Sequence, residues 1–416
     1  MRRLVKPSAV RGVISAPPSK SVAQRAIAIA SLANGESVIF SPGKSDDVIS
    51  AIQVCSDLGA RIETEADKLI INGGISTPNN TLNCGESGLG IRMFSAIAAT
   101  LNQPVTLTGT GTLKNRPMGI IEQSLQQLGV DCNTTNGTVP ISVKGPIARG
   151  FARIDGSKSS QVLSGILIAA PLAQNDLTVR VENLQSKPYI DLTIDVMKKF
   201  GVEVLNENYE TFTVKAGSRY IPTKFAVEGD WSGAAFMLVA GAIAGRVKVE
   251  NLLLTSKQVD RAIVEVLMQI GAKISIFDDG VEVCKQSLFP FHFDATNCPD
   301  LFPPLVALAA HCKGESRILG VSRLRSKESD RAKTLQEEFA KLGVDIKING
   351  ELMQIFGGKV MGGEVQSHGD HRIAMACAVA ALAAEGEVLI ENADAVNKSY
   401  PNFFEDLYKL ATNPGI

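Results

Sequence analysis

The sequence lacks several features that would assign it directly to a common class of protein. Its 42 basic and 43 acidic side chains leave a net charge of −1, without the cationic excess that nucleic-acid backbones require. None of its seven cysteines form a CxxC pair, so neither a disulfide framework nor a zinc ribbon is indicated. The longest apolar stretches, 236–245 and 301–310, are about half as long as a membrane span. The N-terminus lacks the apolar core of a signal peptide. We therefore expect a cytoplasmic protein with no membrane or nucleic-acid partner.

Nucleotide-binding motifs are also missing. The glycine-rich run at 84–92 does not have the GxGxxG spacing of a dinucleotide site, and no GxxxxGK[ST] phosphate loop occurs. His368 and His371 form an HxxH pair, but no third metal-ligand motif accompanies it. We therefore expect no metal site and no site for a dinucleotide or a nucleoside triphosphate.

A repeat of about 70 residues runs through the chain instead. Five times, an amphipathic helix ends in an apolar residue and a glycine, and Ala or Val then opens a strand. Glycine suits this position because it adopts the left-handed conformation that ends a helix. The unit reads as strand, helix, strand, helix, strand, strand, which indicates an α/β fold, and six such units fit the 416 residues. The cap glycines are spaced by 70, 72, 70 and 72 residues and are Gly59, Gly129, Gly201, Gly271 and Gly343.

The sixth unit is incomplete at the C-terminus. It contains a helix at 370–383, a strand at 387–390 and a helix at 400–410, and there the chain stops. Two strands remain at the N-terminus, at 3–6 and 12–15, and we expect both to complete the last unit. The two ends of the chain would then belong to one domain and its middle to another.

Basic and hydroxyl side chains cluster where the predicted helices begin. Such clusters occur at 19–25, 155–161, 323–331 and 369–372. Free backbone N–H groups, the helix dipole and nearby cations together favour phosphate or carboxylate ligands. Each cluster taken alone is also explained by a capped helix with solvated charges. Asp294 and Asp300 precede another apolar helix, and either carboxylate could act as a base or cap that helix. The residues alone favour an enzyme or binder of small phosphorylated carboxylates and do not name a reaction.

Eleven short motifs, taken in order, resemble the family of 5-enolpyruvylshikimate-3-phosphate (EPSP) synthases along nearly the whole chain. They are Ser19-Lys20-Ser21 with Arg25, Ser45-Asp46-Asp47-Val48, 85–92, Asn115-Arg116-Pro117-Met118-Gly119, 155–161, Ser186-Lys187-Pro188-Tyr189-Ile190-Asp191, Val227-Glu228-Gly229-Asp230, 294–300, Lys327-Glu328-Ser329-Asp330-Arg331, Asp370-His371-Arg372 and Asn397-Lys398.

The resemblance implies an enolpyruvyl transferase fold, an inside-out α/β barrel in two similar domains. Each domain has three βαβαββ repeats, one formed by residues 1–17 and 228–416, the other by residues 18–227, with a two-stranded hinge between them. The implied reaction moves the enolpyruvyl group of phosphoenolpyruvate to the 5-hydroxyl of shikimate 3-phosphate by addition and then elimination of phosphate. It serves chorismate and aromatic amino acid biosynthesis, needs no cofactor, and is expected of a monomer.

The family pattern also implies roles for individual residues. Asp294 would accept the proton of the attacking hydroxyl, Glu328 would protonate the methylene carbon, and Lys20 would help the phosphate to leave. Tyr189 and His371 lie beside the matching positions. The positions that match the shikimate 3-phosphate site are Lys20, Ser21, Arg25, Ser159, Ser160, Gln161, Ser186, Asp294, Arg323 and Lys327. Those that match the phosphoenolpyruvate site are Lys20, Gly88, Arg116, Gln161, Arg331, Arg372 and Lys398.

Some positions depart from the family pattern. Glu86 and Leu89 replace the usual asparagine and threonine of the glycine loop. Arg323 stands where an asparagine is common, and the segment 294–300 lacks its usual histidine. The changes at 86 and 89 leave open a weakened or inactive homologue that only binds phosphorylated carboxylates. A sister class that uses UDP-sugars is disfavoured, because it has Lys-Asn where this chain has Lys20-Ser21, and a mobile-loop cysteine that is absent here.

Overall fold

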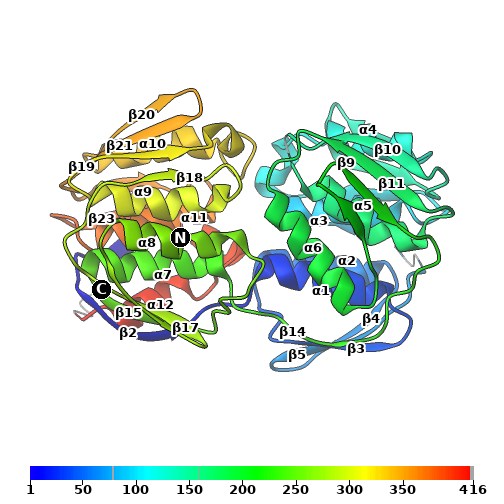
Figure 1. Cartoon of the computed structure of the whole chain (residues 1–416), viewed down its shortest axis with the longest axis horizontal. Helices are drawn as coiled ribbons and strands as arrows, with labels where there is room; N and C mark the ends of the chain where they lie inside the picture. Colours follow the sequence, from blue (N-terminus) through cyan, green and yellow to red (C-terminus); the bar gives the residue numbers. More distant parts are fainter. Residues whose placement is uncertain (77–78, 158, 413–416) are drawn as a thin grey trace. The chain divides into compact units, whose positions relative to one another are not determined.

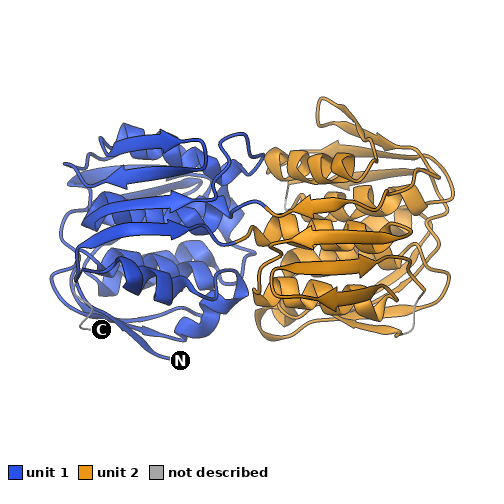
Figure 2. Cartoon of the chain, turned by 90° about the horizontal axis from the view of Figure 1, so that it is seen from below, with its two compact units in different colours: residues 1–17, 228–416 blue, residues 18–227 orange. Residues whose placement is uncertain are grey.

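The computed structural model of the chain describes residues 1–76, 79–157 and 159–412. The chain forms two compact units, which Figure 2 shows in different colours: unit 1 contains Met1–Pro17 and Glu228–Ile416, and unit 2 contains Pro18–Val227. The backbone therefore passes between the units twice, after Pro17 and after Val227.

Unit 2 forms three four-stranded sheets within its described residues. The first contains β14 (Lys224–Ala226), β3 (Glu36–Phe40), β5 (Lys68–Asn72) and β4 (Arg61–Thr64). The second contains β6 (Thr81–Asn83), β7 (Val105–Thr108), β9 (Thr138–Lys144) and β8 (Asp131–Thr135). The third contains β10 (Phe151–Asp155), β11 (Leu177–Glu182), β13 (Thr211–Val214) and β12 (Leu205–Glu207). The helices of this unit are α1 (Lys20–Leu32), α2 (Asp46–Asp57), α3 (Gly88–Ala98), η1 (Gly111–Asn115), α4 (Gly119–Gln127), α5 (Gln161–Ala169), η2 (Ala170–Leu172) and α6 (Lys187–Lys199).

Unit 1 repeats this arrangement, with one sheet of three strands among its described residues. Its four-stranded sheets contain β2 (Val10–Ser15), β15 (Gly245–Glu250), β17 (Gly280–Cys284) and β16 (Lys273–Phe277), and β18 (His292–Asp294), β19 (Gly314–Leu319), β21 (Leu352–Gly357) and β20 (Asp345–Asn349). The three-stranded sheet contains β22 (Gly363–Gln366), β23 (Val388–Glu391) and β1 (Arg3–Val5). The helices are α7 (Trp231–Ala244), η3 (Val259–Ala262), α8 (Ile263–Gln269), η4 (Pro299–Leu301), α9 (Phe302–Ala310), η5 (Val321–Leu324), α10 (Arg331–Lys341), α11 (His371–Ala381), η6 (Ala393–Lys398) and α12 (Phe403–Leu410).

Each sheet begins with a parallel pair of strands and continues antiparallel. Strand pairs β6/β7, β10/β11, β18/β19 and β22/β23 are parallel, and one buried α-helix lies in the connection of each pair, together with a short 3-10 helix in the second and third. A parallel connection needs such a crossover segment. Every residue of α3, α9 and α11 is buried, as expected for helices that are apolar on all sides. Within unit 2, α3 packs against α1 and α5, and within unit 1, α7, α9 and α11 pack against one another (Figure 1).

The predicted cap glycines are confirmed. All five have a positive φ, between 78° and 108°, as the last turn of each helix gives way to a strand. At Gly59 a side chain would also collide with the backbone of Ser76, because an added Cβ would lie 2.7 Å from its carbonyl oxygen. The repeat period therefore follows from a local backbone requirement.

The expected pairing of the N-terminal strands is half wrong. Strand β1 does complete the last repeat, antiparallel to β23. Strand β2, however, is parallel to β15 and supplies the first strand of the repeat that contains α7. Strand β14 has the same role in unit 2, where it is parallel to β3. Both strands directly precede a passage between the units, so each unit closes its first repeat with a strand from a distant part of the sequence.

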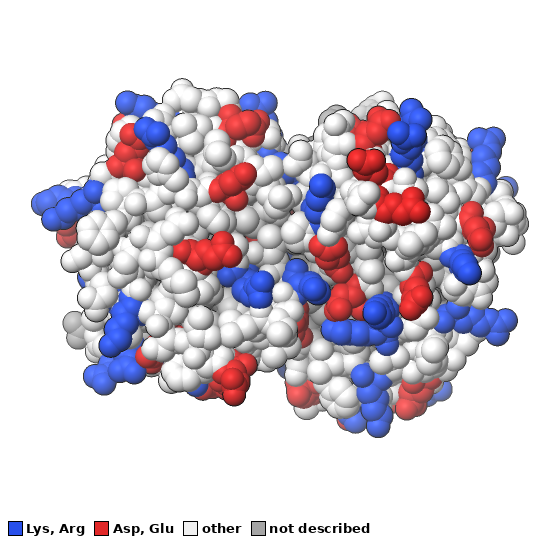
Figure 3. All heavy atoms as spheres, in the orientation of Figure 1, with Lys and Arg blue, Asp and Glu red and all other residues white. Residues whose placement is uncertain are grey.

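The surface carries mixed charges, in agreement with the near-zero net charge of the sequence. In Figure 3, acidic and basic side chains are interspersed over the visible face of both units. Across the described residues, no helix combines the length and apolarity needed to cross a membrane.

Candidate active site

Most of the predicted ligand-binding residues lie where the buried helices begin. Lys20, Gly88 and Gln161 are the first residues of α1, α3 and α5. Helices α3 and α5 follow the first strands of their repeats, β6 and β10, and each of the three helices begins with free N–H groups and the positive end of its dipole. Side chains also connect the helix starts: Ser87 Oγ donates to Gln24 Oε1 at 2.7 Å. The repeat thus brings together residues that are far apart in the sequence.

Arg25 is fixed at the centre of the unit 2 site. It is 1 % exposed, and its guanidinium donates from Nε to Thr193 Oγ1 at 2.8 Å and from Nη1 to the Ser21 carbonyl at 2.8 Å. A third bond runs from Nη2 to the Tyr189 carbonyl at 3.4 Å. Burial lowers the pKa of Arg25 to about 10, with the Tyr189 interaction opposing it, so the side chain stays charged at neutral pH. The cation is therefore held in place before any ligand arrives.

Lys20 has an anionic neighbour within the same unit. Its Nζ lies 2.9 Å from Asp47 Oδ2, at the start of α2, and both side chains are largely buried. This ion pair holds the ammonium at the beginning of α1. Asp47 belongs to one of the eleven motifs of the resemblance, but the sequence does not show that it pairs with Lys20.

Arg116 packs directly on the backbone of Gly88. A Cβ added to Gly88 would lie 2.3 Å from Arg116 Nη1, so only glycine leaves room for the guanidinium. Arg92, one turn further along α3, donates to the Gly88 carbonyl at 2.8 Å and to Gln161 Oε1 at 3.2 Å. The glycine loop, Arg116 and Gln161 are thus brought together, as the resemblance predicts.

The unusual Glu86 binds protein groups beside this loop. Its Oε2 accepts hydrogen bonds from the Thr112 backbone N–H at 3.0 Å and from the Thr112 hydroxyl at 2.8 Å. Thr112 lies in η1, and η1 ends directly before Arg116. The extra carboxylate therefore anchors the segment that leads to Arg116.

The predicted serine residues Ser159, Ser160 and Ser186 lie directly before α5 and α6. Ser159 Oγ accepts from the Gln161 N–H at 3.2 Å, and Ser160 is buried directly before α5. Ser186 precedes α6 in a left-handed conformation, with a φ of 57°, which is uncommon for a residue that has a side chain. Lys158, from the predicted cluster at 155–161, lies outside the described residues.

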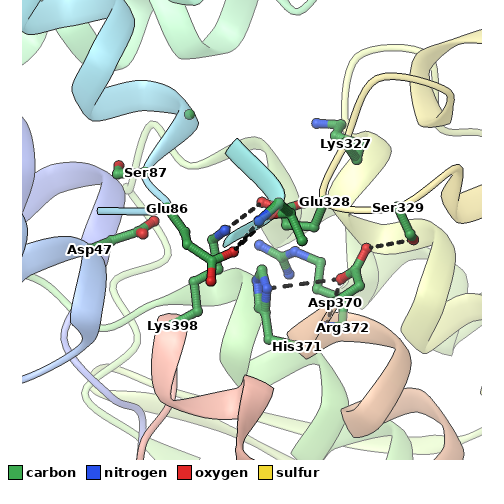
Figure 4. A network of polar contacts seen from close by, with 12 residues as sticks. Asp47, Glu86, Ser87, Lys327, Glu328, Ser329, Asp370, His371, Arg372 and Lys398 are labelled. Carbon is green, nitrogen blue, oxygen red and sulfur yellow. Dashed lines mark hydrogen bonds and ion pairs between the residues drawn. The ribbon is translucent and has the colours of Figure 1, made fainter. Parts of the chain in front are cut away.

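In unit 1, Arg331 is the most enclosed cation of the predicted site. It begins α10, its side chain is 1 % exposed, and it contacts three carboxylates, two of which, Glu328 and Asp370, are labelled in Figure 4. Its Nε lies 2.9 Å from Asp370 Oδ2, its Nη1 3.0 Å from Asp300 Oδ1, and its Nη2 2.7 Å from Glu328 Oε2. Burial lowers the pKa of Arg331, but Asp370, Glu328 and Asp300 outweigh that effect and raise it above the usual value.

Asp300 joins the predicted phosphoenolpyruvate cations to one another. Besides Arg331, it contacts Arg372 Nη2 at 3.0 Å and Lys327 Nζ at 3.4 Å. Burial raises the pKa of Asp300, but Arg372, Lys327 and Arg331 together hold it well below the ordinary value. The carboxylate is therefore ionised and bonded to three cations.

Asp294, the residue expected to act as base, lies elsewhere. It ends β18, is exposed, and accepts a hydrogen bond from the Thr296 N–H at 2.9 Å. Across the described residues, no ion pair connects Asp294 with a lysine or arginine. Its geometry is that of a turn-forming aspartate. The structure thus does not bring Asp294 together with Lys327 and Glu328, whereas it does so for Asp300.

Three other predicted residues of unit 1, Lys327, His371 and Lys398, contact the carboxylates that hold Arg331. Glu328 Oε1 lies 3.7 Å from Lys398 Nζ, and both side chains are at most 10 % exposed. Burial lowers the pKa of Lys327, against the opposing effect of Asp300. His371 Nδ1 lies 3.8 Å from Asp370 Oδ1, and Arg323 is half-buried in η5.

Asp260 is a buried titratable group that the sequence reasoning missed. It is 2 % exposed in η3 and accepts a hydrogen bond from the Ser232 hydroxyl in the first turn of α7. Burial, and then the charge of Asp300, raise its pKa to about 7, while Arg372 lowers it. No sequence motif surrounds Asp260, so its burial is the feature that identifies it.

Replacing Asp260 with asparagine should raise the free energy of unfolding relative to that of the parent, and this gain should grow as the pH rises. The folded-state pKa lies above the unfolded value, so the native protein loses stability from about pH 4 up to about pH 7. Asparagine has no such charge to bury. Between pH 5.5 and 8 the variant should gain about 2 kcal/mol relative to the parent, measured by urea unfolding. The exposed Asp278→Asn serves as the control, and an equal gain there would contradict the assignment.

Comparisons with solved structures identify proteins of the same fold. A solved EPSP synthase from Acinetobacter baumannii has a TM-score of 0.82 and 28 % sequence identity, covering 99 % of this chain and 98 % of that one. The enolpyruvyl transferase NikO from Streptomyces tendae has a TM-score of 0.77 over 98 % of this chain and 97 % of that one, at 16 % identity, which is a likeness of fold alone. The chain therefore has the enolpyruvyl transferase fold, as expected from the sequence.

Sequence relatives narrow the class to one family. The family model of EPSP synthase (3-phosphoshikimate 1-carboxyvinyltransferase) matches residues 4–407. A relative from Clostridium perfringens named 3-phosphoshikimate 1-carboxyvinyltransferase is 39 % identical over 413 residues, covering 98 % of this chain and 97 % of its own. One of the same name from Aeropyrum pernix is 38 % identical over 411 residues, covering 98 % and 95 %. The chain belongs to the EPSP synthase family, an enzyme family of the shikimate pathway, and the expected family is confirmed.

Proposed function

We propose that this chain transfers the enolpyruvyl group of phosphoenolpyruvate to the 5-hydroxyl of shikimate 3-phosphate and releases inorganic phosphate. The observation that carries the proposal is the unit 1 cluster in which Lys327, Arg331 and Arg372 all contact Asp300. Both substrates are phosphorylated anions, and a rigid set of cations is what their binding and alignment require. In unit 2, Arg25 and the serines at the starts of α5 and α6 suit the phosphate and hydroxyl groups of the acceptor.

The reaction requires one proton acceptor and one proton donor. We propose that Asp300, in place of Asp294, takes the proton of the 5-hydroxyl while the hydroxyl oxygen bonds to C2 of phosphoenolpyruvate. Glu328 would deliver a proton to C3, giving a tetrahedral intermediate. The C2–O bond to phosphate then breaks, Glu328 takes a proton back from C3, and the enol ether forms. Lys20 would protonate the departing phosphate.

Each unit contains residues that we propose as phosphoenolpyruvate ligands. Lys20, Gly88, Arg116 and Gln161 of unit 2 remain proposed for it, together with Arg331, Arg372 and Lys398 of unit 1. Since every proposed residue comes from this chain, we propose that it acts as a monomer. Its phosphorylated substrates do not cross membranes unaided, so we place it in the cytoplasm.

A phosphate-release assay tests the proposed function. With phosphoenolpyruvate and shikimate 3-phosphate together, the purified chain should release one phosphate per enol ether formed, and neither substrate alone should give phosphate. Replacement of the acceptor by a UDP-sugar should give no release. Phosphate release from phosphoenolpyruvate with a UDP-sugar but not with shikimate 3-phosphate would assign the chain to the sister class. Binding of both substrates without phosphate release would identify the inactive homologue.

A further inference from the structure

A buried glutamate on α10 binds the turn that leads into α11. The side chain of Glu338 is 2 % exposed, and its Oε1 lies 2.8 Å from His368 Nε2. Its Oε2 accepts the Gln366 backbone N–H at 2.8 Å, and Lys341 Nζ donates to both oxygens, at 2.8 and 2.7 Å. The carboxylate thus has partners on its own helix, at the end of β22, and in the turn.

Glu338 lies on the same face of α10 as Arg331. Seven residues separate them, which is close to two full helical turns. Arg331 contacts Asp370 at one end of the segment 366–370, and Glu338 contacts Gln366 and His368 at the other. A single helix therefore holds this segment at two points about 10 Å apart along its axis.

The turn needs such support because its backbone is unusual. His368 and Gly369 both have positive φ values, 54° and 70°. For His368 this left-handed conformation is unfavourable by itself, so its side-chain contact with Glu338 helps to keep it there. The buried Ser367 hydroxyl donates to the Asn392 carbonyl at 2.8 Å and accepts the Gly369 N–H at 3.2 Å. The conformation of this turn fixes where Asp370 begins α11.

Asp370 in turn places two cations of the proposed phosphoenolpyruvate site. It accepts the Arg372 backbone N–H at 3.0 Å and contacts Arg331 through both carboxylate oxygens. We propose that Glu338 and His368 form a clamp that sets the position of Asp370 and thereby aligns Arg331 and Arg372 for the anionic donor. This inference rests on the proposed function, and it makes Glu338 a positioning residue that does not touch substrate.

The charge of Glu338 agrees with this role. Burial raises its pKa, but the hydrogen bonds from Lys341, His368 and the Gln366 N–H outweigh burial and lower it. The glutamate is therefore ionised when it holds the histidine, and charge-assisted hydrogen bonds are the stronger kind.

Glu338→Gln in the full chain tests the clamp. Glutamine keeps the shape of the side chain but loses the negative charge that holds His368 and the Gln366 N–H, so we expect the KM for phosphoenolpyruvate to rise 5- to 10-fold. The KM for shikimate 3-phosphate and kcat should each stay within about twofold, which a general loss of folded enzyme would not produce. The matched control is Glu337→Gln, whose side chain is half exposed and lies 3.5 Å from Lys333. An unchanged phosphoenolpyruvate KM in Glu338→Gln overturns the proposal.

Two further variants identify the partner that matters. His368→Asn tolerates the left-handed backbone and removes the imidazole, so it should raise the same KM 2- to 5-fold. Lys341→Met leaves the histidine contact intact and should be nearly silent. A strong effect of Lys341→Met beside a silent His368→Asn would overturn the clamp.

A second measurement separates this inference from the proposed reaction. Amide hydrogen exchange at 366–372 should be at least tenfold faster in Glu338→Gln than in the parent, and unchanged in Glu337→Gln. That readout needs no catalysis. If the parent releases no phosphate, the reaction is wrong, and unchanged exchange at 366–372 would still overturn the clamp.

Discussion

Replacing Asp300 with asparagine should lower kcat by about 10²- to 10⁴-fold, the range for loss of a positioned general base. Asp300 is the carboxylate that contacts Lys327, Arg331 and Arg372, at 3.4, 3.0 and 3.0 Å. Asparagine has nearly the same size and can still accept a hydrogen bond, but it cannot take a proton from the acceptor hydroxyl. The measurement is phosphate release with both substrates at saturation.

The matched control is Asp294→Asn, six residues earlier in the same loop. Asp294 is exposed and bonds only the Thr296 N–H among its described neighbours, so we expect less than a twofold change in kcat. The reverse result, a large loss in Asp294→Asn and a small one in Asp300→Asn, would restore the assignment made from the sequence. A tetrahedral adduct that still forms at the parental rate in Asp300→Asn would also contradict the role of base.

The sequence predicted the repeat because its signal is local. Each cap glycine occupies a left-handed position that depends only on the residues of one helix end. Strand pairing instead depends on residues that are distant in the sequence, since β2 pairs with β15 across more than 200 residues of chain. No local pattern distinguishes that partner from the incomplete last repeat, so the prediction for β2 was wrong and that for β1 was right.

The site shows the same division between local and non-local information. The resemblance grouped Arg116 with Gly88 and placed Arg331 in the same motif as Glu328, and the structure shows both contacts. The residues alone did not decide between Asp294 and Asp300, which flank one short turn, and the resemblance assigned the role of base to Asp294. A usable signal existed, since Asp300 lies directly at a helix start, as do Lys20, Gln161 and His371. The contacts of Glu86 with Thr112, and of Asp260 with Ser232, required coordinates.

Replacing Asp370 with alanine should lower the free energy of unfolding by about 3–5 kcal/mol, the range found when one partner of a buried ion pair is removed. Asp370 is 0 % exposed, and Arg331, at 1 % exposure, contacts it through Nε and Nη2. Without Asp370 the guanidinium keeps Asp300 and Glu328 but loses two of its bonds, and α11 loses the side chain that caps it.

A neighbouring aspartate provides the control for this prediction. Asp330 also caps a helix, accepting the Lys333 N–H at 3.4 Å at the start of α10, but it is exposed. Asp330→Ala should cost only the cap, about 1 kcal/mol. The difference between the two variants in urea unfolding therefore measures the buried pairing with Arg331. Asp370→Asn keeps an acceptor for the Arg372 N–H and should fall between them. If Asp370→Ala destabilises no more than Asp330→Ala, then Asp300 and Glu328 alone suffice to hold Arg331, and Asp370 serves only as a cap.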